Sequence, residues 1–417
     1  MRRPPARLSL LLAALVVAAQ PALATQAGNP AVAQVPNGVV ALLEDRGRAW
    51  QTRDRALLEA TMAPGAFAQR ELRSFDNAAE VRFSTYRVSA LTRFSGDIAW
   101  PRVRELYPGS EVSAFHVVEE TAVSGVERLP YAESGFYTFV RAGADGGDRY
   151  EGWRLASDTD FEALGGFSPV PLWAGGPVRA VTSRNFVLLA HPDRVEQVRG
   201  VVQLAEQAYE EAKRFWPRPA GDRYVIVVPS TSAELGRMIQ ATIDLDKFVA
   251  FAGRTHRYEG DFPPAGVRVF INLERFARYD AAAQRGIMAH ELIHAITTPA
   301  SGPFVPVWVE EGLAMHGSEP ESGVRAARGG RTPEEFPTSD LFYVGSVGDI
   351  VRTYARSQVA FEVLDAQRGR DSMARFYEQL GATRFSAGTS EYHVRRVVEG
   401  ALGWSVEEWT KAWRDRL

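Results

Sequence analysis

The chain has 417 residues, of which 45% are hydrophobic and 24% are charged, and its formal net charge is −3 at pH 7. This composition is that of an ordinary globular protein with room for two or three domains. The small net charge gives no electrostatic case for nucleic acid as a partner. The chain contains no cysteine, so it forms no disulfide, and any metal site must use histidine and carboxylate ligands.

Residues 1–24 have the features of a secretory signal peptide. Three arginines precede the apolar run Leu8–Ala19, which is too short to span a bilayer comfortably. Small residues at the end of the segment predict cleavage after Ala24, and an uncleaved N-terminal anchor is the alternative. We therefore expect a secreted or otherwise exported protein with no membrane span after cleavage, and a disordered lead-in over residues 25–36.

Residues 37–164 are expected to form a small accessory domain of helices followed by an antiparallel sheet. Apolar spacing predicts helices over Val39–Glu59 and Phe67–Ala79. Alternating residues predict strands over Ser84–Leu91, Ser113–Ala122, Gly135–Arg141 and Arg149–Ala156. This order resembles the cone of the nuclear transport factor 2-like superfamily, which can hold a small ligand. A scaffold or docking role is the preferred interpretation.

Residues 165–177 contain four glycines and three prolines and predict a linker, with Trp173 docking it onto one domain. A second domain is expected over residues 178–417. Its predicted strands are Asn185–Ala190, Tyr224–Val228, Phe248–Ala252 and Val267–Asn272, and its first predicted helices are Asp193–Phe215 and Thr231–Thr242.

A zinc-binding pattern lies on the next predicted helix, which Asp280 caps and Pro299 closes. His290, Glu291 and His294 read His-Glu-x-x-His, so the two imidazoles leave one helix face a turn apart. This spacing suits two corners of a tetrahedral zinc site. Glu291, about 100° around the helix, can face a water beside the metal. The alternative is an amphipathic helix with solvated or hydrogen-bonded histidines.

The third ligand is expected on the helix that starts near Pro306 and contains Trp-Val-Glu-Glu-Gly-Leu-Ala. Glu311 is the candidate, and Glu310 is the rival, interpreted as a solvated or supporting carboxylate. Gly312 costs about 1 kcal/mol relative to alanine inside a helix. We expect it to permit close approach to the first helix, which brings Glu311 within reach of the metal.

His-Glu-x-x-His followed by Trp-x-x-Glu-Gly-x-Ala resembles the gluzincin metallopeptidases, which include thermolysin and the aminopeptidase N group. It is most similar to the peptidase MA-like domains. The resemblance covers residues 178–417 and implies an α+β, thermolysin-like catalytic domain with a mixed-sheet lobe and a helical lobe. It implies one Zn²⁺ per chain held by His290, His294 and Glu311, with Glu291 as general base. The exopeptidase motif Gly-x-Met-Glu-Asn is absent, so aminopeptidase activity is not implied.

The resemblance also implies two further parts of a site. Val267–Asn272 takes the place of the strand that forms the upper rim of the cleft and pairs with extended substrate, and an ordinary sheet strand is the alternative. A tyrosine on a later helix can polarise the substrate carbonyl, and Tyr354 is the choice, with Tyr343 and His316 as competing donors. Residues 317–348 are interpreted as a flap beside the cleft, or as disorder without function.

The remaining chain is expected to form a helical lobe. The predicted helices are Asp349–Gln367, Ser372–Leu380, Glu391–Ala401 and Val406–Arg416, with Trp404, Trp409 and Trp413 in its core. The sequence therefore predicts an exported zinc metallopeptidase that acts on a peptide or protein substrate. The alternatives are an exported binding or scaffold protein, non-catalytic or weakly active, that retains the peptidase fold, and an intracellular scaffold with an accidental motif. The oligomeric state is not indicated.

Overall fold

The structure is a computed structural model. It describes residues 35–91, 101–141, 148–164, 166, 168, 170–221, 223–239, 248–256, 264–318, 326–327, 334–383 and 390–417. The expected signal peptide, most of the expected lead-in and much of the expected flap lie outside these residues.

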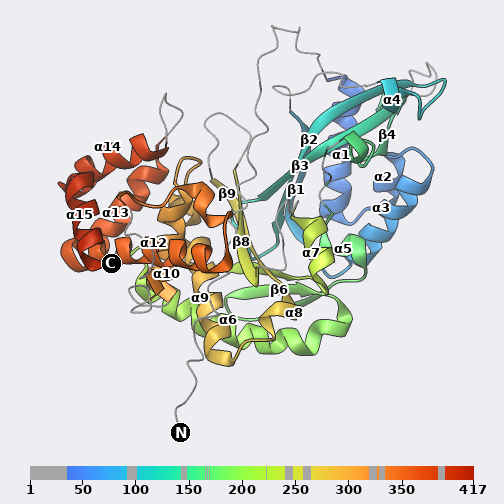
Figure 1. The fold of residues 1–417 in the computed structure, drawn as a ribbon. Helices are drawn as coiled ribbons and strands as arrows, with labels where there is room; N and C mark the ends of the chain where they lie inside the picture. Colours follow the sequence, from blue (N-terminus) through green and yellow to red (C-terminus); the bar gives the residue numbers. More distant parts are fainter. Residues whose placement is uncertain are drawn as a thin grey trace.

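The first part of the chain packs three helices against a four-stranded antiparallel sheet (Figure 1). The helices are α1 (Asn37–Thr52), α2 (Arg55–Ala60) and α3 (Ala66–Asn77), and a short helix, α4 (Pro101–Arg104), follows β1. The strands, in spatial order, are β1 (Phe83–Ala90), β2 (Glu111–Val123), β3 (Tyr131–Arg141) and β4 (Trp153–Ser157). All four predicted strands are confirmed, with shifted ends.

The single helix predicted over Val39–Glu59 is wrong, because the chain breaks between α1 and α2. Arg53 adopts a left-handed conformation (φ 62°), and Asp54 then caps α2 by accepting a hydrogen bond from the backbone N–H of Leu57. The apolar spacing continues across the break, so periodicity alone did not reveal it. Asp54, a residue type that favours helix starts, was the available signal.

The expected linker docks onto the first sheet through Trp173, as predicted. It includes the short helix α5 (Leu172–Gly175), and the 3₁₀ turn η1 (Glu162–Leu164) precedes it. The ring of Trp173 is buried, with its centroid 6.1 Å from that of Trp50 and 5.6 Å from that of Phe83. Burying these rings together is a large apolar contribution to one core.

A second, five-stranded sheet follows, with spatial order β5-β6-β7-β9-β8. Its strands are β5 (Arg179–Thr182), β6 (Phe186–Ala190), β7 (Tyr224–Val228), β8 (Ala250–His256) and β9 (Pro264–Ile271). The strands β6, β7 and β9 are parallel, whereas β5 and β8 run antiparallel at the two edges. Between the strands lie η2 (Pro192–Arg194), α6 (Val195–Phe215) and α7 (Ser232–Met238). The short strand β5 was not predicted.

The strand expected at the rim, Val267–Asn272, corresponds to β9 and is not an edge strand. It lies between β7, with which it pairs in parallel, and β8, with which it pairs antiparallel. The edge is β8, because β8 and β9 form a hairpin and β9 already pairs with β7 on its other side. Strand order depends on such long-range pairing, which the pattern of single strands does not contain.

Helices complete the fold on the side of the second sheet away from the first sheet (Figure 1). They are α8 (Leu273–Phe276), α9 (Ala281–Thr297), α10 (Val307–Ser318), α12 (Val347–Arg368), α13 (Arg370–Gly381), α14 (Ser390–Leu402) and α15 (Val406–Arg416), with 3₁₀ turns η4 (Thr298–Ala300) and η5 (Ser339–Phe342). Trp404, Trp409 and Trp413 are buried in this lobe, as predicted. The fold is thus a mixture of helices and sheets. No helix in the described part of the chain has the length and apolar character needed to span a bilayer.

Gly312 permits a close approach, but to α12 and not to the zinc-pattern helix as expected. A Cβ atom on Gly312 would lie 2.6 Å from the carbonyl oxygen of Ser357 and 2.7 Å from a ring carbon of Phe361. Both residues belong to α12. The glycine therefore sets the spacing between α10 and α12, and through it the place of Glu311.

We predict that Gly312→Ala lowers the free energy of unfolding by about 1–3 kcal/mol, because the added methyl overpacks the contact with α12. Gly200→Ala is the matched control, since Gly200 lies in α6 with no described atom within 4 Å of an added Cβ. It should raise stability by about 1 kcal/mol through helix propensity. Denaturant unfolding measures both, and equal effects of the two substitutions would contradict the close-contact role of Gly312.

Candidate metal centre

The helix α9 is fixed at both ends by its own side chains. Asp280 accepts a hydrogen bond from the backbone N–H of Ala283 at 2.9 Å, as its predicted capping role requires. At the other end Thr297 and Thr298 donate to the backbone carbonyls of Ile293 and His294 at 2.8 and 2.9 Å. These bonds satisfy carbonyl groups in the last turn, next to the second histidine of the pattern.

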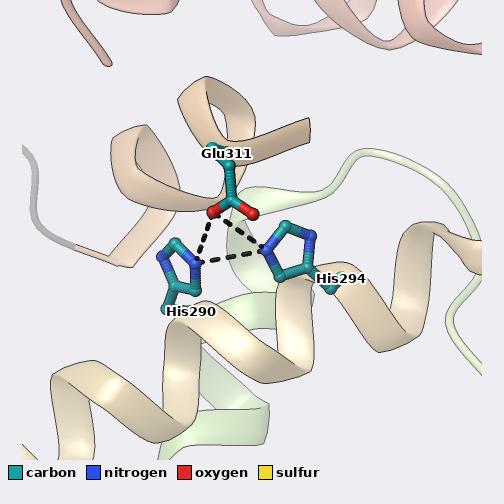
Figure 2. A group of neighbouring side chains, drawn as sticks. All are labelled: His290, His294 and Glu311. Carbon is teal, nitrogen blue, oxygen red and sulfur yellow. Dashed lines mark hydrogen bonds and ion pairs between the residues drawn. The ribbon is translucent and has the colours of Figure 1, made fainter. Parts of the chain in front are cut away.

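His290, His294 and Glu311 converge on one point between α9 and α10 (Figure 2). The Nε2 atoms of the two histidines are 3.2 Å apart, and the Oε2 atom of Glu311 lies 3.2 Å from Nε2 of His290 and 3.5 Å from Nε2 of His294. Zinc bonds of about 2.0–2.1 Å imply a tetrahedron with edges of about 3.3–3.4 Å. The three separations have the size of three such edges.

Burial favours the metal-binding form of both imidazoles. His290 and His294 are 3% and 1% exposed. Burial lowers the pKa of His290 to about 3 and holds the pKa of His294 well below its usual range. A neutral imidazole keeps a lone pair free for a metal. Two neutral Nε2 atoms that face each other at 3.2 Å are well arranged to share a cation.

The buried ionisable groups around this cluster suit a divalent cation. Glu291, Glu310 and Glu311 are all buried, and burial raises the pKa of each carboxyl group. Among the described residues whose charges act on these three, the buried cation is the guanidinium of Arg254. With a cation bound, all three carboxylates can ionise, and against one guanidinium they then carry a net charge of −2. Because unpaired buried charge is costly, an ion of charge +2 fits this site.

Unpartnered oxygen atoms at the same place also fit a metal. The Oε1 atom of Glu311 is buried and has no hydrogen-bond partner among the described residues. The buried carboxylate of Glu291 has no side-chain partner there, although the backbone N–H of Ala252 is close enough to lower its pKa. Buried polar atoms in folded proteins normally have partners, so such a group needs an explanation. A metal and its water would supply the partners. The residues present therefore fit the zinc that the sequence implies.

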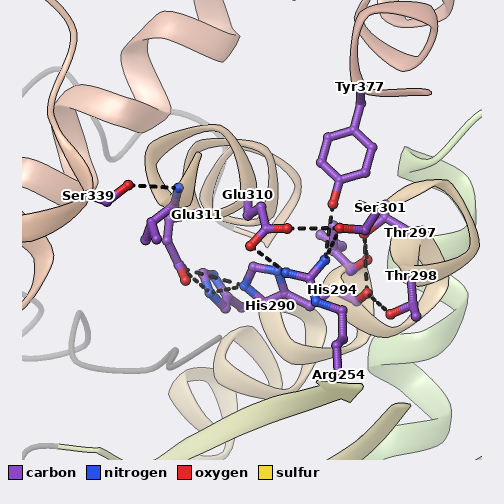
Figure 3. Close-up of polar contacts among 12 residues, drawn as sticks. Arg254, His290, His294, Thr297, Thr298, Ser301, Glu310, Glu311, Ser339 and Tyr377 are labelled. Carbon is purple, nitrogen blue, oxygen red and sulfur yellow. Dashed lines mark hydrogen bonds and ion pairs between the residues drawn. The ribbon is translucent and has the colours of Figure 1, made fainter. Parts of the chain in front are cut away.

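Glu310, the rival ligand, turns out to be buried and to face a different group (Figure 3). Its carboxylate forms an ion pair with Arg254 of β8 at 2.5 Å and accepts a hydrogen bond from the hydroxyl of Ser301 at 2.9 Å. The prediction that Glu310 is a solvated carboxylate is thus wrong. The alternative prediction, a carboxylate that supports the site, is compatible with these contacts. Sequence analysis missed Arg254 and Ser301, because a lone arginine in a strand carries no signal of a buried partner.

Tyr354 lies near the cluster. It is 2% exposed, and its ring packs edge-on against that of Phe342 at 4.9 Å. Burial, followed by the charge of Glu311, raises its phenol pKa well above the usual value. Tyr343 is 38% exposed, and burial of its hydroxyl together with the charges of Glu311 and Glu310 likewise raises its pKa. Both phenols therefore stay protonated and can donate a hydrogen bond near Glu311.

His316, the other competing donor, is engaged elsewhere. Its Nε2 atom lies 3.0 Å from a carboxylate oxygen of Asp365 on α12, and its ring packs edge-on against Phe215 of α6. These contacts direct the imidazole to the junction of α6 and α12 and not to the histidine pair on α9.

Known proteins give little further indication of the function of this chain. No protein-family model matches the chain, and no curated protein matches it. Among solved structures, the chain is similar to a two-domain M1 zinc metallopeptidase, a mutant bound to L-arginine, with 10% sequence identity and a TM-score of 0.33. The similarity covers 73% of this chain and spans about 61% of the length of that protein. The side chains of the cluster are therefore the stronger indication of function.

We predict that the purified protein binds about one zinc per chain and that His290→Ala and Glu311→Gln each lose it, because each removes one of three ligands. Glu310→Gln is the matched control on the same helix. It should keep zinc but lower stability, since it leaves Arg254 buried without its ion-pair partner. Metal analysis by mass spectrometry and thermal unfolding measure the two effects. Zinc lost in Glu310→Gln and kept in Glu311→Gln would reverse the ligand assignment.

Proposed function

We propose that the protein is an exported zinc metallopeptidase that hydrolyses peptide bonds in a peptide or protein substrate. The observation that carries the proposal is the three-cornered arrangement of His290, His294 and Glu311, with the buried carboxylate of Glu291 beside it. Three protein ligands leave a fourth position, which is the feature of a catalytic zinc site. Export is proposed from the sequence of residues 1–24 alone.

Zinc, when bound, supplies the Lewis acidity that activates a water and polarises a carbonyl group. Glu291 follows His290 directly and sits about 100° further around α9, so its carboxylate lies beside the metal and not among the ligands. It takes the proton of the attacking water as general base and delivers it to the leaving amine. Tyr354 donates a hydrogen bond to the carbonyl oxygen as negative charge develops there.

The edge strand β8 is the proposed template for the substrate backbone. It ends the second sheet, and α9 packs against it. A peptide can add to a sheet edge by main-chain hydrogen bonds. The sequence predicted that Val267–Asn272 pairs with the substrate. In this proposal Ala250–His256 takes that role instead. The residues of β8 from Ala250 to Thr255 are buried, so a peptide reaches the strand only when the groups that cover it move aside.

A second candidate function is suggested by the same burial. His290, Glu291, His294 and Glu311 are each at most 3% exposed. A metal that substrate cannot reach can serve only a structural role. The alternative is therefore an exported binding or scaffold protein in which zinc holds α9 and α10 together. The two functions differ in whether Glu291 is needed for a reaction.

We predict that the zinc-loaded protein cleaves peptides in a complex peptide library and that Glu291→Gln abolishes cleavage while zinc content stays near one per chain. Loss of a general base should lower the rate by about 10²–10⁴-fold. Glu196→Gln on the exposed face of α6 is the control and should leave the rate unchanged. Mass spectrometry of the library measures both. Full zinc occupancy in a wild-type protein that cleaves nothing would favour the structural-metal alternative.

The two tyrosines near Glu311 can be separated by removing one hydroxyl at a time. We predict that Tyr354→Phe lowers kcat by about 10²–10³-fold with little change in KM, as expected when a donor to the oxyanion is lost. Tyr343→Phe should change kcat far less. Steady-state kinetics on a cleaved peptide decide between them, and the opposite pattern would assign the donor role to Tyr343.

A further inference from the structure

Two neighbouring carboxylates on α10 compete for one metal. Glu310 and Glu311 are 4% and 0% exposed, so both are held inside the protein near the histidine pair. Their side chains leave the helix about 100° apart. A divalent cation attracts both carboxylates strongly in a buried site. Some feature of the fold must decide which one binds.

Arg254 is the group that engages Glu310. Its guanidinium forms an ion pair with Glu310 at 2.5 Å and donates hydrogen bonds to the hydroxyls of Ser301 at 2.8 Å and Tyr377 at 3.2 Å. Ser301 in turn donates to the other carboxylate oxygen of Glu310 at 2.9 Å. Figure 3 shows this network beside the histidine pair, with Arg254 extending from β8 and Tyr377 approaching from α13. Both oxygens of Glu310 are therefore held.

The strand that carries Arg254 is itself fixed from its other face. The next residue, Thr255, accepts a hydrogen bond from the backbone N–H of Ala132 at 3.0 Å, and Ala132 belongs to β3 of the first sheet. The neighbouring strand β9 is held by Arg268, which binds both carboxylate oxygens of Glu127 at 2.8 and 2.9 Å. Arg254 is thus presented to Glu310 from a strand that is held in place.

We propose that Arg254 is a positioning residue that assigns the metal its carboxylate ligand, by holding Glu310 away from the centre and leaving Glu311 to bind. The inference rests on the proposed metal site and deepens it. A planar guanidinium suits the task, because it can hold a carboxylate and donate to two hydroxyls at the same time, whereas a lysine ammonium is a single point of charge. Without Arg254, Glu310 is a buried charge with no cation except the metal, and it is drawn to the metal as a further ligand.

The test uses Co²⁺ in place of zinc, because its visible absorption is strong in four-coordinate sites and weaker as further ligands bind. We expect Arg254→Met to bind Co²⁺ with a clearly weaker band, as Glu310 joins the metal. The double variant Arg254→Met with Glu310→Met removes both partners and should restore the wild-type band. Arg46→Met is the matched control. It breaks another buried arginine–glutamate pair, with Glu71, between α1 and α3 of the first part of the chain, and should lower stability without changing the spectrum.

If Arg254→Met binds Co²⁺ and its absorption band is as strong as that of the wild-type protein, the inference is overturned. The proposed metal site would not be affected by that result. Absence of any Co²⁺ band in the wild-type protein would instead overturn the metal site itself, and the inference with it. If Arg254→Met does not fold, Arg254→Lys decides the matter. A lysine holds Glu310 less firmly than the arginine does, so the Co²⁺ band should be weaker than in the wild-type protein, by less than is expected for Arg254→Met. A band of wild-type strength would overturn the inference.

Discussion

The constraint that governs this structure is the burial of charge at one point. Three carboxylates, one guanidinium and two neutral imidazoles lie within the protein between α9, α10 and β8. The carboxylates can be ionised there only if each charge is compensated, because burial otherwise favours their protonated forms. Arg254 compensates Glu310, and a divalent cation would compensate Glu291 and Glu311. The surrounding elements are arranged so that both forms of compensation are possible at once.

The first sheet helps to position this buried cluster. The turn between β2 and β3, together with the start of β3, holds β8 and β9. The contacts include Arg268 with Glu127, Thr255 with Ala132, and the backbone N–H of Gly266 with the carbonyl of Pro130. The hairpin then presents Arg254 to α10. On the opposite side Gly312 lets α10 approach α12 closely, which sets the position of Glu311. The cluster is therefore positioned by parts of the chain that are far apart in sequence.

The sequence predicted those parts of the fold and site that depend on short spacing. His290 and His294 lie on one face of α9 because helical geometry fixes residues four apart, and Asp280 caps that helix because its side chain can reach the third residue of the helix. The break at Arg53 was missed, since apolar spacing continues through it. The place of β9 inside the sheet, the neighbour of Gly312 and the partner of Glu310 were missed or misjudged because each depends on contacts between distant segments. No local pattern marks Arg254 as buried.

The proposed function depends on one property of the protein, that His290, His294 and Glu311 hold a zinc ion together. The most direct test is a crystal structure of the zinc-loaded protein with anomalous diffraction recorded at the zinc edge. We predict a single anomalous peak about 2.0–2.1 Å from Nε2 of both histidines and about 2.0–2.2 Å from one carboxylate oxygen of Glu311. A zinc peak at other residues, or no peak with Glu311 hydrogen-bonded directly to the imidazoles, would contradict it.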